Sequence, residues 1–122
     1  MNSAGIFYCI NNHVLVLLKK NGLYTLPGGR LQHNTCVLEK FENETGVPLQ
    51  STQDNPVSID RHYRVYFVKA PEKCDTSCFV KGKHLALDWI PFSIHRSKCD
   101  FILQRAFHLK ASSVIDDLYF SD

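Results

Sequence analysis

Two apolar segments joined by a pair of asparagines open the chain, and they limit its possible folds more than any other feature. Residues 5–10 read Gly-Ile-Phe-Tyr-Cys-Ile, and residues 13–18 read His-Val-Leu-Val-Leu-Leu. Both are β-prone runs of strand length, and Asn11-Asn12 between them suits a tight turn. The sequence therefore predicts that the fold begins with a β-hairpin.

A sharp turn and one helix are expected next. Pro27-Gly28-Gly29 requires the backbone to bend sharply. Asn34 or Thr35 can then cap a helix that runs to about Thr45 and ends at Gly46. The buried stripe of this helix is expected to consist of Val37, Leu38 and Phe41.

The second half of the chain predicts more strands and a terminal helix. Residues 61–69 alternate between two sets of side chains, which is the period of an interior strand, and residues 98–110 place apolar side chains at helical spacing. Further elements are expected as short strands over residues 23–26, 78–80 and 85–90, a loop over 48–56, and a last turn or helix from Ser112 or Ser113. This order predicts an α/β sandwich in which helices cover a mixed β-sheet.

The composition supports a single globular domain over residues 1–122 and excludes several classes of protein. Hydrophobic residues make up 44% of the chain and charged residues 21%, as in ordinary globular domains. The formal net charge is only +2, which does not indicate a sequence-independent interaction with duplex nucleic acid. No apolar stretch approaches the about 18 residues that cross a bilayer, so no membrane partner is expected.

The cysteines indicate a reducing environment. They number five, an odd count, and lie scattered through the expected elements, which suits free thiols better than a disulfide framework. An intracellular protein, most simply a cytoplasmic one, is therefore expected. Cys74 and Cys78 could hold zinc together with a histidine, but no second ligand pair follows at a typical spacing, so incidental thiols are the competing interpretation.

Residues 26–30 and 39–47 carry the pattern with the strongest chemical meaning. They read Leu-Pro-Gly-Gly-Arg and Glu-Lys-Phe-Glu-Asn-Glu-Thr-Gly-Val, and together they resemble the Nudix box. In that family a Gly-Gly turn leads to a helix whose glutamates share one face and hold divalent cations against a pyrophosphate. Residues 88–92, Asp-Trp-Ile-Pro-Phe, are similar to the end of the family's sheet. The resemblance spans most of the chain and implies a Nudix-like α/β/α sandwich with a mixed sheet.

Several functional positions of the box carry other residues. When the chain is aligned on the closing residues 44–47, Asn43 and Lys40 stand where the family has glutamates, and Glu39 stands where it has an arginine. The loop over residues 31–35 is shortened and contains no acidic residue. A lysine repels the cation that the box should attract. The sequence therefore predicts weakened metal binding, and a non-catalytic domain would require no cofactor.

A shifted register would keep a partial metal site. Glu39, Glu42 and Asn43 form an i, i+3, i+4 set on the expected helix. If the protein is an enzyme, the resemblance implies that Glu44, Glu42 and Glu39 are its catalytic residues and the ligands of Mg²⁺ or Mn²⁺. The competing interpretation is that these glutamates are solvated charges on an exposed helix face.

Five residues are candidates for lining a nucleotide-binding cleft, and these are Tyr24, Arg30, His33, Arg61 and Arg64. An arginine can form a bidentate contact with a phosphate, and an aromatic ring can stack on a base. Periodicity alone does not say which face of a strand meets a cleft. The competing interpretation places the aromatic residues of the 61–69 strand in the core and its arginines in solvent.

Three functions remain open on these grounds. The first is a non-catalytic Nudix-like domain, a pseudoenzyme, that binds a nucleotide, an RNA end or a protein partner, and it follows from the substituted box. The second is a divergent metal-dependent pyrophosphohydrolase that cleaves a nucleoside diphosphate linked to another group. The third is a structural subunit that docks through the apolar residues 118–120, Leu-Tyr-Phe.

Overall fold

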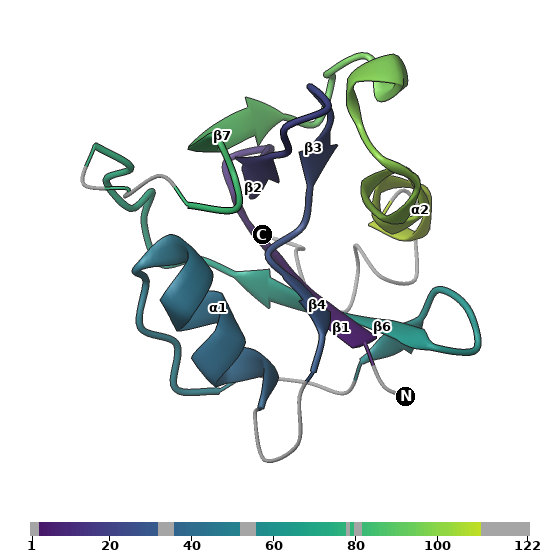
Figure 1. Ribbon diagram of the computed structural model, residues 1–122, viewed down its shortest axis with the longest axis horizontal. Coiled ribbons are helices and arrows are strands. Elements are labelled where there is room, and N and C mark those ends of the chain that lie inside the picture. Colours follow the sequence, from purple (N-terminus) through teal and green to yellow (C-terminus); the bar gives the residue numbers. More distant parts are fainter. Residues whose placement is uncertain (1–2, 32–35, 52–55, 78, 80–81, 111–122) are drawn as a thin grey trace.

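The sheet is organised around β1 (Ser3–Ile10), which has partners along both edges. The computed structural model describes residues 3–31, 36–51, 56–77, 79 and 82–110. On one edge β1 pairs in parallel with β6 (Tyr63–Lys69), and on the other it pairs antiparallel with β2 (His13–Leu18) and β4 (Gly28–Arg30). This arrangement makes β1 the centre of a mixed sheet (Figure 1).

Three shorter or later strands complete the sheet. β3 (Tyr24–Thr25) and β7 (Ala86–Pro91) both pair antiparallel with β2, and β5 (Val57–Ser58) pairs antiparallel with β6. The described part of the chain thus forms a sheet of seven strands. The predicted α/β class with a mixed sheet is confirmed.

The β1–β2 hairpin closes as predicted but pairs over only a few residues. Asn11 and Asn12 have φ angles of 52° and 60°, the positive values that a two-residue hairpin turn requires. Cα partners between the strands occur only beside this turn, at Cys9↔Val14 and Ile10↔His13. The segment from β3 to β4 then pairs first with β2 and afterwards with β1, so it bridges the two strands where they stop pairing with each other.

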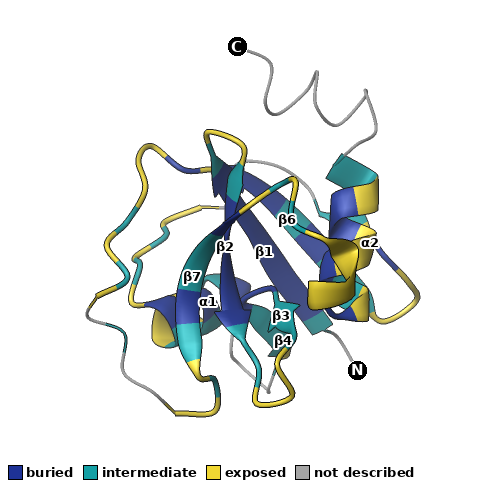
Figure 2. Cartoon of the chain, turned by 90° about the horizontal axis from the view of Figure 1, so that it is seen from above, coloured by how far each residue is buried: buried dark blue, intermediate teal, exposed yellow. Residues whose placement is uncertain are grey.

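Two helices cover opposite faces of the sheet, and side-chain alternation along β1 divides the core between them (Figures 1 and 2). Phe7 and Cys9 point to the side covered by α2 (Phe101–Lys110). Ile6 and Tyr8 point to the side covered by α1 (Val37–Thr45). Because both faces are buried, β1 and β2 are apolar at nearly every position instead of at alternate ones.

The first helix follows the prediction except at its start. α1 ends at Gly46, which has a φ of 77° and donates its backbone N–H to the Glu42 carbonyl at 2.7 Å. Val37 and Phe41 are buried as expected, whereas Leu38 is only partly buried. The N-cap, however, is Cys36, whose side chain makes no capping hydrogen bond. The predicted cap at Asn34 or Thr35 is therefore wrong, and those two residues lie outside the described range.

The second helix begins later than predicted, because a short 3₁₀ turn precedes it. Residues 96–98 form this turn, and α2 starts at Phe101 instead of Lys98. Asp100 sets the start, since its carboxylate accepts a hydrogen bond from the Leu103 backbone N–H at 2.9 Å. No helix in the described part of the chain is long and apolar enough to cross a membrane.

The shortest strands and the loops were predicted less well than the longer elements. The sequence did not predict β4 or β5. Of the expected strand over residues 78–80, Phe79 is not in a strand and the other two residues lie outside the described range, as do Ser112 and Ser113. Residues 48–51 and 56 form neither helix nor strand, in agreement with the predicted loop.

We predict that Gly28→Ala destabilises the fold far more than Gly22→Ala. Gly28 has a φ of 130°, and a Cβ at this position would collide with the Ala4 carbonyl oxygen of β1. Gly22 also has a positive φ, 87°, but a Cβ there meets no atom within 4 Å. We expect a loss of about 3 kcal/mol or more for Gly28→Ala and about 1–2 kcal/mol for Gly22→Ala in urea unfolding. Equal losses would contradict the close contact between β4 and β1.

Candidate functional site

A carboxylate from α1 holds the Gly-Gly segment in place. Glu44 Oε1 accepts a hydrogen bond from the Gly28 backbone N–H at 2.6 Å, across 16 residues of sequence. Burial raises the pKa of the Glu44 carboxyl, while the Gly28 bond and the positive charges of Lys40 and Lys83 oppose that rise. Glu44 therefore contributes to the structure of the turn whether or not it has any other role.

The other predicted acidic residues are not gathered beside Glu44. Glu39 and Glu42 are both exposed, as is Asn43. At about 100° per residue, Glu42 lies about 200° around the helix from Glu44, on the opposite side. No three His, Cys, Asp or Glu side chains of the described residues are grouped as metal ligands. The donor set that the structure describes does not fit a divalent-cation site, and the metal-binding and catalytic roles of these three glutamates stay predictions.

Lys40 lies where the Nudix pattern has a glutamate, and its side chain extends to the Gly-Gly segment. A Cβ built on Gly29 would lie 3.7 Å from Lys40 Cε. Lys40 is also four residues from Glu44, so the two side chains share one face of α1. The helix thus presents a cation to the turn where the resemblance implies an anion.

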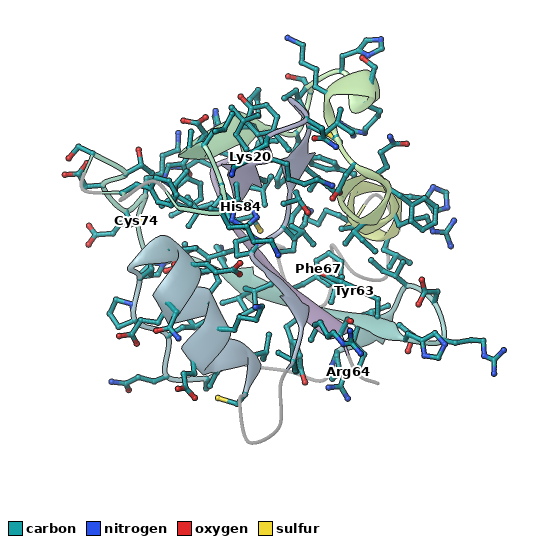
Figure 3. The ribbon with its side chains drawn as sticks, viewed as in Figure 1. Lys20, Tyr63, Arg64, Phe67, Cys74 and His84 are labelled. Atoms are coloured by element: carbon teal, nitrogen blue, oxygen red, sulfur yellow. The ribbon has the colours of Figure 1, made fainter. Side chains whose placement is uncertain are left out.

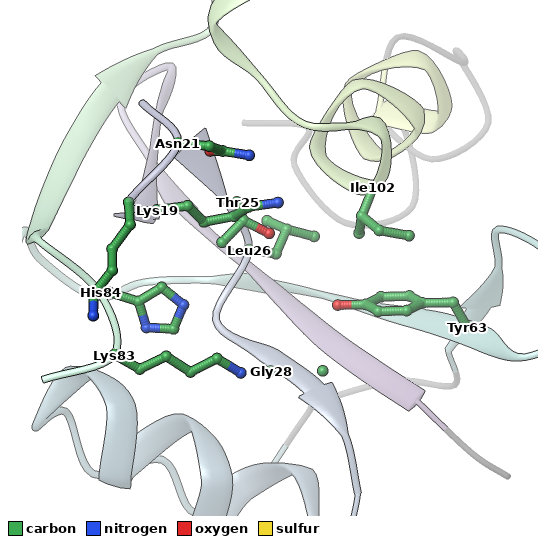
Figure 4. Close-up of a pocket in the computed structure, with 11 residues that line it drawn as sticks. Lys19, Asn21, Thr25, Leu26, Gly28, Tyr63, Lys83, His84 and Ile102 are labelled. Atoms are coloured by element: carbon green, nitrogen blue, oxygen red, sulfur yellow. The ribbon is translucent and has the colours of Figure 1, made fainter. Parts of the chain in front are cut away.

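A cavity of about 540 Å³ opens beside this turn (Figure 4). Its basic lining comes from two segments that are far apart in the sequence, the loop after β2 and the segment before β7. Its remaining lining comes from Asn21 of the loop after β2, from Leu26 between β3 and β4, and from β3, β4, β6 and α2. The residues that line it are Lys19, Lys20, Asn21, Thr25, Leu26, Gly28, Gly29, Tyr63, Lys83, His84 and Ile102. None of these lining residues is acidic.

Strand register explains why the basic side chains meet. β2 and β7 pair antiparallel with Leu18 opposite Ala86, and the Leu85 backbone N–H donates to the Leu18 carbonyl at 2.8 Å. The residues that follow β2 are therefore held beside the residues that precede β7. Lys20 and His84, which come from these two segments, both line the cavity, and Figure 3 labels them.

The cationic side of the cavity faces an apolar and aromatic side. Tyr63 points its hydroxyl into the cavity, near Ile102 and Leu26 (Figure 4). Burial raises the pKa of the Tyr63 phenol well above its usual range, so the hydroxyl stays protonated. Gly5 of β1 makes room for this ring, because a Cβ on Gly5 would lie 2.5 Å from the Tyr63 hydroxyl oxygen.

The residues predicted to bind a ligand are placed elsewhere or lie outside the described range. Tyr24 packs against the core on the α2 side, and Arg30 and Arg61 are exposed. Arg64 follows Tyr63 on β6, so it points to the opposite face of the sheet, and Figure 3 shows it away from Lys20 and His84. His33 is not among the described residues. None of the four described residues lines the cavity.

Sequence reasoning missed the lysines and His84 because they occupy turn-like segments. The register of the two predicted strands over residues 13–18 and 85–90 was the signal that could have identified them. Two further expectations can be placed. Phe67 is a core residue, as the competing interpretation held. Of the possible zinc pair, Cys74 accepts a hydrogen bond at its backbone carbonyl from the Trp89 indole N–H at 3.0 Å. Cys78, the second thiol of the possible zinc pair, lies outside the described residues.

We predict different effects for two substitutions of Glu44. Glu44→Ala removes the acceptor of the Gly28 N–H and is expected to cost about 1–3 kcal/mol of unfolding free energy. Glu44→Gln keeps an oxygen acceptor and removes a partly buried charge, so its stability should stay within about 1 kcal/mol of the parent protein. Urea unfolding near neutral pH measures both. A Glu44→Ala protein as stable as the parent would contradict the structural role of this hydrogen bond.

Comparisons with known proteins address the fold. No protein-family model matches the chain, and no curated protein matches it by sequence. Among solved structures, it is similar to a bifunctional NMN adenylyltransferase/ADP-ribose pyrophosphatase from Francisella tularensis, with a TM-score of 0.66 and 14% identity. That match covers 93% of this chain and 41% of the Francisella protein, so the chain spans about two fifths of that protein's length.

Two further solved structures are matched along most of their own length. An ADP-ribose pyrophosphatase from Streptococcus suis has a TM-score of 0.57 and 13% identity, with 91% of this chain and 92% of that chain covered. A protein named as a Nudix hydrolase family member from Chromobacterium violaceum has a TM-score of 0.59 and 17% identity, with 92% and 80% covered. Identities this low establish the architecture alone, and the chain therefore has a Nudix-like fold.

Proposed function

We propose that this Nudix-like domain binds a nucleotide through its phosphates, in the lysine-lined cavity, without a metal ion and without hydrolysing it. The observation that carries the proposal is the charge of the cavity. Lys20, Lys83 and His84 line it together with Lys19, and no lining residue is acidic. A phosphate group is the common biological ligand that matches such a site.

The lysines can supply the neutralisation that a metal ion would otherwise supply. Two opposite unit charges about 4 Å apart attract each other by about 4 kcal/mol near a protein surface, before the cost of desolvation is subtracted. Lys20 and Lys83 are exposed, so they can reach a ligand at little cost in desolvation. Lys19 is already shared with Asp100, whose carboxylate oxygen lies 3.3 Å from its Nζ. Lys20 and Lys83 are therefore the principal phosphate contacts.

The cavity also has the size and the second surface that a nucleotide requires. Its volume of about 540 Å³ lies within the range of about 300–1,000 Å³ that is typical of small-molecule sites. Leu26, Tyr63 and Ile102 provide apolar contact area for a base or a sugar. Two of the similar solved structures are named as ADP-ribose pyrophosphatases, which makes ADP-ribose the first ligand to test.

The substituted box supports binding over metal-dependent hydrolysis. Lys40 extends to Gly29, and the Glu44 carboxylate already accepts the Gly28 N–H. A cation placed beside the turn would meet the Lys40 ammonium and would compete with Gly28 for the Glu44 oxygen. The alternative function is a divergent Mg²⁺- or Mn²⁺-dependent pyrophosphohydrolase that uses Glu39, Glu42 and Glu44, and turnover measurements separate the two.

We predict metal-independent binding that depends on the cavity lysines. Isothermal titration calorimetry with ADP-ribose, a nucleoside triphosphate and capped RNA should detect binding of at least one ligand in EDTA. Lys83→Gln should weaken it about three- to tenfold, and Lys20→Gln combined with Lys83→Gln should weaken it further. Lys73→Gln is the matched control, because Lys73 is exposed and does not line the cavity.

Turnover assays supply the opposing test. Phosphate release in Mg²⁺ or Mn²⁺ should remain at background for the whole panel of ligands. Metal-dependent turnover that disappears in Glu44→Gln would contradict the proposal and establish the hydrolase. Binding that is equally tight in Lys83→Gln and in the parent protein would contradict the assigned site.

A further inference from the structure

His84 is a histidine in the lining of a cavity whose other basic residues are lysines. It precedes β7, is partly buried, and lines the cavity next to Lys83 (Figure 4). An imidazole is the one ordinary side chain whose charge changes near neutral pH. A ligand in this cavity therefore lies next to a group that can gain a positive charge.

The charged groups that face His84 come from every segment around it. Lys83 lies on its own segment, Lys19 follows β2, and Lys40 lies on α1. Burial lowers the pKa of His84 below its ordinary value of 6.5, and these three positive charges lower it further. Lys20 lines the same cavity.

Two carboxylates that could compete for the cationic groups, those of Asp100 and Glu44, already have other partners. Asp100 pairs with Lys19 at 3.3 Å and caps α2 through Leu103. Glu44 accepts the Gly28 N–H. Tyr63, across the cavity, is held in its neutral form by burial. The environment of His84 without a ligand is therefore dominated by cations.

We propose that His84 couples ligand binding to proton uptake, so that the cavity binds a phosphorylated ligand more tightly in mildly acidic solution than at about pH 8. This inference rests on the proposed function, because it requires an anion in the cavity. A bound phosphate offsets the repulsion from the lysines and attracts the imidazolium directly. Linkage is reciprocal. If the bound ligand raises the proton affinity of His84, protonation of His84 raises the affinity for the ligand by the same factor, so binding becomes tighter as the pH falls.

The same linkage fixes the sign of the stability change. Because the pKa of His84 is lowered in the folded protein, the unfolded chain takes up the proton first as the pH falls through about 6.5. His84 therefore makes the unliganded fold less stable as the solution becomes acidic. A ligand that restores the proton affinity of His84 removes this loss, so the increase in melting temperature on adding ligand should be larger at acidic pH.

The experiment measures ADP-ribose affinity by calorimetry between about pH 5.5 and about pH 8. ADP-ribose is the probe because both phosphates of its pyrophosphate are esterified, so its charge does not change in this range. The parent protein is compared with His84→Gln and with the matched control His108→Gln, which removes an exposed histidine of α2 outside the cavity. Titrations in buffers with different ionisation enthalpies give the number of protons taken up.

The expected result is an affinity about five- to tenfold higher at the acidic end for the parent and for His108→Gln, with net proton uptake near pH 6. In His84→Gln, both the pH dependence and the proton uptake should disappear. Equal pH dependence in His84→Gln and the parent would overturn the coupling while leaving the proposed function intact. Absence of binding at every pH would overturn both. An NMR titration of His84 in the parent protein, with and without ADP-ribose, does not require the variant to fold, and an unchanged titration would also overturn the coupling.

Discussion

The contact between Gly28 and β1 is the constraint on which the rest of the structure depends. β1 and β2 stop pairing soon after their turn, and the segment over residues 24–30 bridges them by pairing first with one and then with the other. This bridge requires a residue without a side chain where the chain passes Ala4. Glu44 stabilises it from the α1 side with a hydrogen bond of 2.6 Å. The position of α1, the bend after Pro27 and one wall of the cavity all follow from this contact.

The charge of this site is opposite to that of the metal site that a Nudix box forms. A Nudix box assembles carboxylates around a Gly-Gly turn, whereas here the turn faces Lys40 and a cavity lined by lysines. Glu44 keeps the carboxylate of one box position, but this carboxylate already accepts a hydrogen bond from the Gly28 backbone N–H. The proposed function follows from this difference in charge, because lysine side chains attract phosphate groups. The proposed function, binding of a phosphorylated ligand without its hydrolysis, accounts for these substitutions.

Much of the fold could be predicted from the sequence because its signals are local. The asparagine turn, the apolar runs of the hairpin, the glycine that ends α1 and the alternation along β6 each act within a few residues. β4 and β5 could not be predicted in this way, since strands of two or three residues are too short to show a period of their own and are defined by the strands they pair with, β1 for β4 and β6 for β5. The residues of the site were harder to predict from the sequence than the short strands were. Lys20 and His84 come to line the same cavity through the register of β2 against β7, and their own segments indicate nothing more than turns.

NMR shift mapping tests the central claim, metal-free binding of a phosphorylated ligand in the lysine-lined cavity, most directly. ADP-ribose would be added to ¹⁵N-labelled protein in EDTA while the backbone amide resonances are followed. The account predicts that the largest changes occur at residues 19–21, 28–29 and 83–84, which line the cavity. It also predicts little effect of Mg²⁺ on Glu39 and Glu42, which are exposed on α1. Changes that require Mg²⁺ and centre on those two glutamates would contradict it.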